Sequence, residues 1–257
     1  MTREEAIIVL RDAGVPNPAT DIRRLWDAGR SKTEDWFTEA VSRRAAREPV
    51  SHILGYRDFW KHRFKVTADV LDPRPETELL VEIALRRPFS HVLDLGTGSG
   101  AIIISLLADR PEATGVGTDV SENAVLIAGE NASRIGVADR LILPLSEWWD
   151  DVGGRYDLIV SNPPYISACE MDDLAPEVRE FEPRLALTDE KDGLSSYRAI
   201  AAGVEHHLSE AGRLLLEIGP TQAAAVQTIL VDAGLAIRAV HADLDGRDRV
   251  IEANISG

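Results

Sequence analysis

Residues 76–257 alternate between strand-like and helix-like segments, and this order limits the possible folds more than any other feature of the chain. Short apolar runs bounded by Gly, Pro or Asp indicate strands, and segments with helical spacing of apolar residues separate them. Such alternation favours an α/β fold, a doubly wound parallel sheet with helices on both faces. The seven expected strands are 91–95, 114–119, 141–145, 156–161, 213–218, 236–241 and 249–253. The expected helices are 76–86, 99–110, 121–134, 195–208 and 221–233.

The first 75 residues differ in character from the rest. Thr2 and Glu5 form a capping-box pattern ahead of an apolar stripe that ends at Gly14, and two further helices are expected around 19–28 and 33–47. Residues 56–70 place aromatic and Val residues in partly alternating order, which indicates a hairpin. The expected organisation is a helical domain at 1–55, a hairpin linker at 56–75 and the α/β domain at 76–257.

Composition excludes several classes of protein. A chain of 257 residues with 44% hydrophobic content can form one sizeable core and a small extra domain. Its single cysteine, Cys169, permits no internal disulfide, and the start of the chain lacks a signal-peptide pattern. The apolar run 101–108 is too short to span a bilayer. We therefore expect a soluble cytoplasmic protein without a membrane partner, and we find no metal-ligand spacing, so no metal is expected.

The net charge of −15 is unevenly distributed. Residues 1–75 hold 14 Lys and Arg against 12 Asp and Glu, whereas the remainder holds 14 against 31. An acidic surface repels phosphate backbones, so a duplex-DNA substrate is disfavoured and no direct nucleic-acid partner is expected. A basic cluster in the first part either meets a partner or forms a solvated face, and both readings stay open. The cluster comprises Arg43, Arg44, Arg47, Arg57, Lys61, Arg63 and Lys65.

Three loops are expected at the carboxyl ends of the strands, where open α/β sheets bind ligands. Asp94 lies near the end of the first strand and a glycine-rich turn follows it. Asp119 ends the second strand, and Glu147 and Trp148 follow the third. Glycines allow close backbone approach, a carboxylate accepts ribose hydroxyls, and an indole flanks a purine. These features outline an adenosine site, but they equally fit the relaxed dinucleotide fingerprint. The candidate cofactor residues are Asp94, Gly96, Thr97, Gly98, Ser99, Gly100, Asp119, Glu147, Trp148 and Asn162.

Asn162 follows the buried strand 156–161, so its side chain is expected beside the cofactor. Two prolines after it restrict the backbone and make the turn rigid. The side-chain oxygen of Asn162 and the carbonyl of Pro163 can each accept one N–H of a substrate amino group, while Tyr165 offers a flat face. This arrangement favours methyl transfer to a planar nitrogen, although the motif alone is also compatible with a simple turn. The candidate catalytic and substrate-binding residues are Asn162, Pro163, Pro164 and Tyr165.

These motifs resemble the class I S-adenosylmethionine-dependent methyltransferases, and specifically the PrmC/HemK family of release factor glutamine methyltransferases. The resemblance covers nearly the whole chain, with Pro-Arg-Pro-Glu-Thr-Glu at 73–78 as its most specific stretch. Asp72 and Glu147 depart from the commoner pattern, which has an apolar residue and Asp at those positions. The other matching stretches are 162–165, 177–183, 192–194 with 197–198, and 215–219.

The resemblance implies a Rossmann-like methyltransferase sheet and N5-methylation of the glutamine in the Gly-Gly-Gln loop of class 1 peptide chain release factors, a step connected with translation termination. It implies that residues 96–100 contact the methionine part of S-adenosyl-L-methionine, Asp119 the ribose, and Trp148 the adenine. Asn162 and Pro163 would hold the glutamine amide, and the helical domain would help to hold the release factor. Arg74, Glu76 and residues 181–183 form either a site wall or a folded linker.

Two alternatives stay open at this point. Asn-Pro-Pro-Tyr also suits an exocyclic base amine, so the chain could be an adenine-N6 or guanine-N2 nucleic-acid methyltransferase, which would flip its base out of the helix. The other alternative is a non-catalytic cofactor-binding or translation-associated module, and the intact Asn162 motif argues against it.

Overall fold

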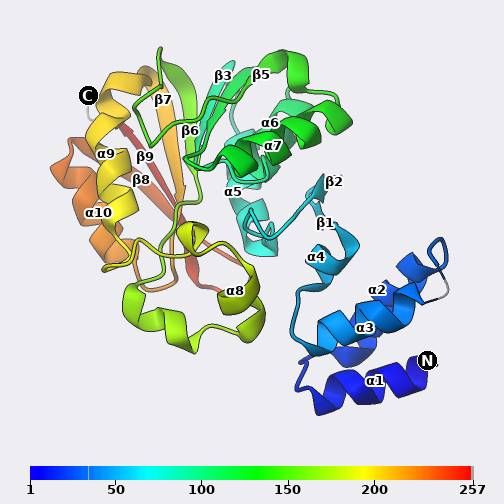
Figure 1. Cartoon of the computed structure of the whole chain (residues 1–257). Coiled ribbons are helices and arrows are strands. Elements are labelled where there is room, and N and C mark those ends of the chain that lie inside the picture. The colour runs from blue at the N-terminus through cyan, green and yellow to red at the C-terminus, as the bar shows by residue number, and fades with distance from the viewer. Residues whose placement is uncertain (34, 256–257) are drawn as a thin grey trace.

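The computed structural model describes residues 1–33 and 35–255, and its main body is a seven-stranded sheet (Figure 1). The order of the strands is β5-β4-β3-β6-β7-β9-β8. The expected strands are all present, but the expectation of a wholly parallel sheet is wrong because β9 runs antiparallel to both neighbours. The loop 243–247 between β8 and β9 is too short for a parallel crossover. The strands are β3 His91–Leu95, β4 Thr114–Thr118, β5 Leu141–Ile142, β6 Tyr156–Ser161, β7 Leu208–Glu217, β8 Leu235–Ala242 and β9 Asp248–Ile255.

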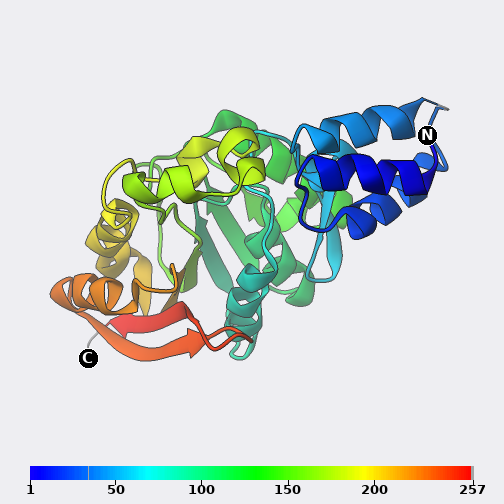
Figure 2. The same cartoon turned by 90° about the horizontal axis from the view of Figure 1, so that it is seen from below.

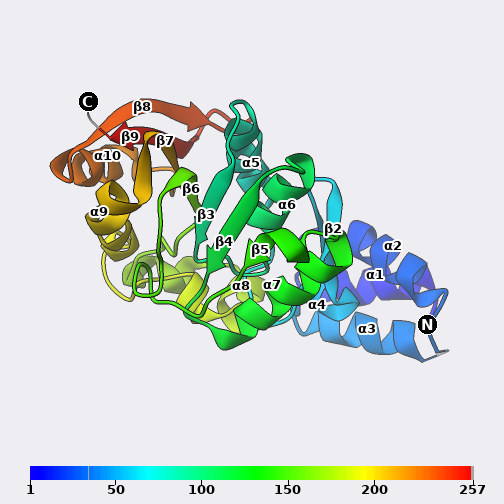
Figure 3. The ribbon, with the colours of Figure 1, turned by 90° about the horizontal axis from the view of Figure 1, so that it is seen from above.

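Helices cover both faces of the sheet, as the alternating pattern predicts (Figure 3). Helices α5 Glu78–Leu85, α6 Ala101–Asp109 and α7 Glu122–Ile135 lie on one face, and α9 Ser195–His207 with α10 Ala223–Asp232 on the other. Successive strand residues point to opposite faces. Val92, Leu158 and Val160 therefore join the core beneath α5 and α6, whereas Leu93, Ile159 and Leu216 join the core beneath α9 and α10.

The first three helices form a separate bundle with its own apolar core (Figure 1). These helices are α1 Arg3–Asp12, α2 Pro18–Gly29 and α3 Trp36–Ala45, and the expected capping box at Thr2 and Glu5 is present. A fourth helix, α4 Val50–Leu54, was not predicted. The hairpin is shorter than expected, with β1 Tyr56–Phe59 and β2 His62–Lys65. The division into domains at residues 55 and 75 stays a prediction.

The segment between β6 and α9 contains three short helices that were not predicted. They are η3 Ala168–Asp173, α8 Pro176–Phe181 and η4 Arg184–Ala186. Helix α8 lies beside the N-terminal bundle (Figure 2). Glu177 on α8 accepts hydrogen bonds from Arg44 at 2.9 Å and from Arg47 at 2.6 Å, and Arg44 also pairs with Asp21 at 2.8 Å. This half-buried ion network joins the bundle to the body that carries the sheet.

Every member of the basic cluster is paired with an acidic side chain. Lys61 contacts Asp109 at 2.7 Å, and Arg57 contacts Asp72 at 3.5 Å. The positive charge of the cluster is therefore balanced at short range. The remaining pairs are Arg43–Glu48, Arg44 with Asp21 and Glu177, Arg47–Glu177, Arg63–Asp58 and Lys65–Glu130. Within residues 1–33 and 35–255, no helix combines the length and apolar character needed to cross a membrane.

Candidate active site

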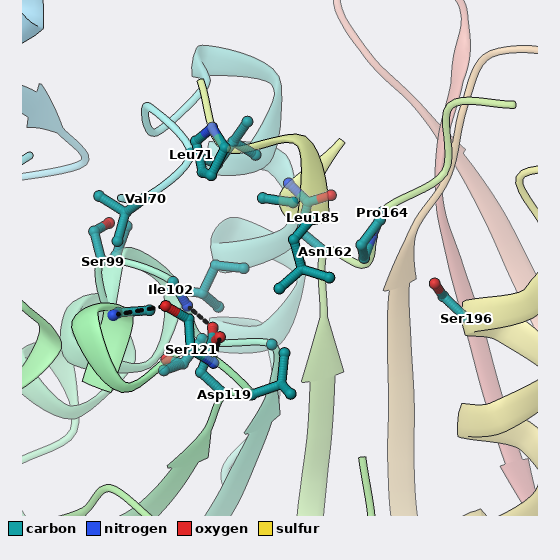
Figure 4. A pocket seen from close by; sticks show the side chains of 18 of the residues that line it. Val70, Leu71, Ser99, Ile102, Asp119, Ser121, Asn162, Pro164, Leu185 and Ser196 are labelled. Carbon is teal, nitrogen blue, oxygen red and sulfur yellow. Dashed lines mark hydrogen bonds between the residues drawn. The ribbon is translucent and has the colours of Figure 1, made fainter. Parts of the chain in front are cut away.

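A cavity of about 510 Å³ opens at the carboxyl ends of β3, β4 and β6 (Figure 4). Asp119 and Ser121 lie toward one end, Pro164 and Ser196 toward the other, with Asn162 and Leu185 between them. The structure thus brings together side chains from distant parts of the sequence. The candidate residues that line the cavity are Gly96, Thr97, Gly98, Ser99, Asp119, Glu147, Trp148, Asn162 and Pro164.

The glycine-rich turn between β3 and α6 leaves room for a ligand. Gly96 and Gly98 have φ values of +71° and +55°, and a Cβ added to either would meet no protein atom within 4 Å. Gly100 has a different role, because its Cβ would lie 2.5 Å from Ile104 Cδ1 and Gly100 does not line the cavity. Gly100 allows the turn to enter α6, and its contact with a cofactor stays a prediction.

Asp119 follows β4 and reaches the cavity from below the glycine-rich turn. Its two carboxylate oxygens accept hydrogen bonds from the backbone N–H of Gly98 at 2.8 Å and of Ser121 at 2.9 Å. Burial raises the pKa of Asp119, and these N–H groups act in the opposite direction. Each oxygen retains a further lone pair, so the carboxylate can accept ribose hydroxyls.

Asp94 lies behind the turn rather than in the cavity lining. Its Oδ2 accepts a hydrogen bond from Thr97 Oγ1 at 2.8 Å, and its Oδ1 has no partner among the described residues. Complete burial raises the pKa of Asp94 to about 7, against the effect of the Thr97 hydrogen bond. Asp94 supports the turn from beneath, and its expected contact with the cofactor stays a prediction.

The loop after β5 supplies a flat apolar surface. Ser146 N donates to the Asp119 carbonyl at 2.9 Å, which fixes this loop to the end of β4. Trp148 lines the cavity with a φ of +48°, a left-handed conformation that is unfavourable for a non-glycine residue. Glu147 lines the cavity beside it with an exposed side chain. Together with the open glycine-rich turn and the Asp119 carboxylate, Glu147 and Trp148 form a site that fits an adenosine.

The turn after β6 presents two hydrogen-bond acceptors. Ser161 Oγ donates to the Leu95 carbonyl at 2.6 Å and fixes the end of β6 to β3. Asn162 Nδ2 donates to Thr77 Oγ1 at 3.2 Å. In the described part of the chain, neither Asn162 Oδ1 nor the Pro163 carbonyl receives a hydrogen bond from a protein donor. Both oxygens therefore retain their capacity to accept a hydrogen bond. Asn162 lines the cavity, whereas Pro163 is buried and lies outside the lining, so the contact of its carbonyl with a substrate N–H stays a prediction.

Tyr165 lies behind this turn and does not line the cavity. Its ring packs against the apolar core beneath α9 and α10, and burial raises the pKa of its phenol. Its carbonyl accepts a hydrogen bond from Gln222 Nε2 at 2.8 Å. The main-chain carbonyl of Tyr165 thus helps to fix the turn. The expected contact of its ring with a planar substrate group stays a prediction.

Gly193 packs directly against the same turn, which makes a substitution there informative. It has a φ of +74°, and an added Cβ would lie 2.3 Å from the Tyr165 carbonyl oxygen. We expect Gly193→Ala to lower the free energy of unfolding by about 2–4 kcal/mol, because strain and a backbone clash combine. Thermal or urea unfolding measures this effect, and methyl transfer should fall with it as the turn shifts.

Gly246 provides the matched control for that prediction. Its φ is +78°, yet a Cβ there would meet nothing within 4 Å. Gly246→Ala should therefore show only the conformational penalty of about 1 kcal/mol. Equal destabilisation by the two substitutions would show that the contact with Tyr165 carries no energetic weight.

One part of the cavity wall is built from two stretches far apart in the sequence. Arg74 and Pro183 both line it, and Arg74 Nη2 donates to the buried carboxylate of Glu182. Burial raises the pKa of Glu182 to about 7, while Arg74 acts to lower it. This ion pair supports the site-wall reading for Arg74 and Pro183. Glu76 is exposed and lies outside the lining.

Three buried carboxyl groups predict an unusual pH dependence of stability. Burial raises the pKa of Asp94, Glu182 and Glu217 to about 7 each. A raised folded-state pKa favours the folded protein at low pH, so this stabilisation is lost as pH rises from about 4.5 to 7. Glu217→Gln should flatten the decline and stabilise the protein above pH 7 by on the order of 3 kcal/mol. Urea unfolding between pH 5 and 8 checks this, and parallel profiles for both proteins would contradict it.

Comparisons with known proteins agree with this geometry. A family model described as the methyltransferase small domain matches residues 67–178. A release factor glutamine methyltransferase of Cereibacter sphaeroides is 57% identical over 219 residues, which is 85% of this chain and 79% of that protein. The chain belongs to the release factor glutamine methyltransferase family. A member from Caulobacter vibrioides is 41% identical over 263 residues, covering 94% of this chain and 91% of that protein.

Solved structures of other methyltransferases share the fold of this member of the release factor glutamine methyltransferase family. A methyltransferase from Pyrococcus furiosus has a TM-score of 0.58 at 16% identity, covering 74% of this chain and 87% of that one. The ribosomal protein L11 methylase of Lactobacillus delbrueckii has a TM-score of 0.51 at 22% identity, covering 79% of this chain and 90% of that one. At these identities the likeness establishes the methyltransferase fold alone.

For this member of the release factor glutamine methyltransferase family, sequence reasoning missed several residues that shape the site. Leu71 and Leu185 line the cavity, and Gln222 braces the turn. Thr77 contacts Asn162, and its only signal was its place in Pro-Arg-Pro-Glu-Thr-Glu. Within residues 1–33 and 35–255, no group of three or more His, Cys, Asp or Glu side chains has the arrangement of a metal site.

Proposed function

We propose that this protein transfers a methyl group from S-adenosyl-L-methionine to the side-chain amide nitrogen, N5, of the glutamine in the Gly-Gly-Gln loop of class 1 peptide chain release factors. The observation that carries the proposal is Asn162 in the lining of a cavity that fits a nucleoside, with Oδ1 free of protein donors in the described part of the chain and the Pro163 carbonyl next to it in the turn. The names of close relatives supply the substrate class.

The residues that would hold the cofactor are those around the glycine-rich turn. The open backbone at Gly96 and Gly98 would receive its methionine part, and Asp119 would accept the ribose hydroxyls. Trp148 would flank the adenine. When bound, the cofactor supplies a methyl group on a positively charged sulfur, which leaves as a neutral thioether.

The chain itself contributes orientation and electrostatic stabilisation. An amide nitrogen is a poor nucleophile because its lone pair is delocalised into the carbonyl. Two fixed acceptors that hold both N–H bonds align the nitrogen for attack. The same carbonyl dipoles stabilise the positive charge that grows on nitrogen as the N–C bond forms, and one N–H proton is then lost to water. Asn162 and Pro163 therefore act without a strong base.

A nucleic-acid base amine is the main rival substrate, and charge weighs against it. Binding to DNA or RNA depends largely on Lys and Arg that neutralise phosphates. The seven members of the basic cluster are each paired with an acidic side chain, and residues 76–257 hold 14 Lys and Arg against 31 Asp and Glu. A protein substrate avoids this repulsion.

The N-terminal bundle has a place in the same proposal. We assign residues 1–55 to recognition of the release factor, as a unit next to the body that carries the cavity (Figure 1). The ion network of Glu177 with Arg44 and Arg47 fixes the bundle against the segment that leads into the cavity wall. A folded protein partner could then contact the bundle while one of its loops enters the cavity.

Transfer of a labelled methyl group tests the proposed function. The full-length protein is incubated with labelled cofactor and a purified class 1 release factor, and label is expected on the factor. A factor with Gln→Ala in Gly-Gly-Gln is the matched control and should remain unlabelled, as should a DNA duplex. Labelling of the duplex, or equal labelling of both factors, would reject glutamine as the acceptor.

A further inference from the structure

The side chain of Asn162 has two ends of nearly equal shape but opposite chemistry. Its oxygen accepts hydrogen bonds, and its nitrogen only donates them. A flipped amide would place an NH₂ group against the NH₂ group of the acceptor, with two donors facing each other. The orientation of this one amide therefore decides whether the turn attracts or repels an amino group.

Thr77 is in contact with the nitrogen end of that amide. It ends the short helix η1 Pro75–Thr77 and lines the cavity with only 3% of its surface exposed. Asn162 Nδ2 lies 3.2 Å from Thr77 Oγ1. A threonine hydroxyl has a single proton, so it can donate to one neighbour only and must accept from any other.

Glu217 is the candidate acceptor for that proton. It is the last residue of β7 and only 1% exposed, and the Thr77 hydroxyl acts to lower the pKa of its carboxyl group. Above its pKa of about 7 the carboxyl group is ionised, and an ionised carboxylate has acceptors alone. Glu217 Oε2 has no hydrogen-bond partner among residues 1–33 and 35–255, so this buried group depends on the few donors near it. Thr77 accepts from Asn162 Nδ2, which leaves its own proton for the ionised Glu217 carboxylate.

We propose that Thr77 and Glu217 are positioning residues, which fix the Asn162 amide with its nitrogen toward Thr77 and its oxygen toward the acceptor nitrogen. The relay runs from Asn162 to Thr77 to Glu217, with one proton donated at each step. The inference rests on the proposed function only in requiring an acceptor that carries an N–H. It applies equally to a glutamine amide and to a base amine.

Thr77→Val removes the hydroxyl and retains the shape of the side chain. We expect kcat to fall about 10- to 100-fold, the range for a buried polar group left without its partner. The cofactor dissociation constant, measured by calorimetry, should differ from that of the wild type by less than about twofold. Thr77 acts on the acceptor nitrogen, through Asn162, rather than on the cofactor. Thr77→Ser restores the hydroxyl and should recover most of the lost kcat. Undiminished kcat in Thr77→Val, or an equal loss in Thr77→Ser, would overturn the proposal.

A double-mutant cycle separates positioning from a general structural role. In Asn162→Asp both ends of the side chain are oxygens, so no orientation remains to be set. Thr77→Val should then cost less than about twofold in kcat, against about 10- to 100-fold in the wild-type background. An equal loss in both backgrounds would show that Thr77 acts through the fold. Where Asn162→Asp is too slow to assay, the comparison of Val with Ser at position 77 decides.

The cycle is run with whichever substrate accepts the labelled methyl group, a release factor or a nucleic acid. Loss of the Thr77 effect with an active substrate contradicts the positioning role. Absence of label on a release factor, with label on another amine, contradicts only the proposed substrate. The two failures are therefore distinguishable.

Discussion

Asn162→Ala should lower kcat for methyl transfer by about 10²- to 10³-fold while the cofactor dissociation constant changes by less than about twofold. The substitution removes Oδ1, one of the two acceptors that hold the substrate N–H groups, and leaves the glycine turn and Asp119 intact. Steady-state methylation with saturating cofactor measures kcat, and calorimetry measures cofactor binding.

Asn162→Asp is the conservative companion to that variant. It retains an acceptor oxygen, so its kcat should lie between those of wild type and Asn162→Ala. Equal loss of cofactor binding and methyl transfer in Asn162→Ala would assign Asn162 to the cofactor rather than to the acceptor nitrogen. A kcat for Asn162→Asp below that of Asn162→Ala would reject the role of an acceptor oxygen.

Asp119→Ala should weaken cofactor binding by about 10- to 150-fold, which corresponds to charge-assisted hydrogen bonds worth about 1.5–3 kcal/mol. The Asp119 carboxylate lies in the cavity lining and has lone pairs left for ribose hydroxyls. At saturating cofactor, kcat should change far less than the dissociation constant. Calorimetric titration with cofactor gives the first quantity directly.

Asp157→Ala is the matched control for Asp119→Ala. Asp157 also accepts two backbone N–H groups, from Ser90 at 2.9 Å and His91 at 3.1 Å, but it does not line the cavity. It should lose stability without losing affinity for the cofactor. If both variants weaken cofactor binding alike, the effect comes from the sheet rather than from a ribose contact.

The sheet was predictable because its pattern is local. Residues 91–95 and 156–161 are each short and mostly apolar, and the glycines and prolines that follow them act within a few residues. The short helices α4, α8 and η3 were not predictable in this way. They have five or six residues each, and contacts made elsewhere in the chain stabilise them, as Glu177 shows for α8.

The candidate site was predictable where its chemistry is carried by a motif. The turns that hold Gly96 and Asn162 both reach the cavity because carboxyl ends of parallel strands meet at one edge. Residues that act through another residue of the site were harder to predict. Tyr165 faces the core, and Thr77 reaches Asn162 across 85 positions of the chain, a pairing that no local spacing encodes.

The Glu177 carboxylate joins the N-terminal bundle to the segment that leads into the cavity wall. One of its arginine partners, Arg44, lies on α3, and the other, Arg47, follows that helix, while α8 leads toward Pro183 in the cavity lining. A truncated chain without the bundle would lack the unit proposed to recognise the release factor, and it would also leave a half-buried anion without counter-charges. Lower turnover by such a fragment would therefore combine weaker binding of the partner with a displaced cavity wall, and point substitutions on the outer faces of α1 and α2 would report partner binding alone.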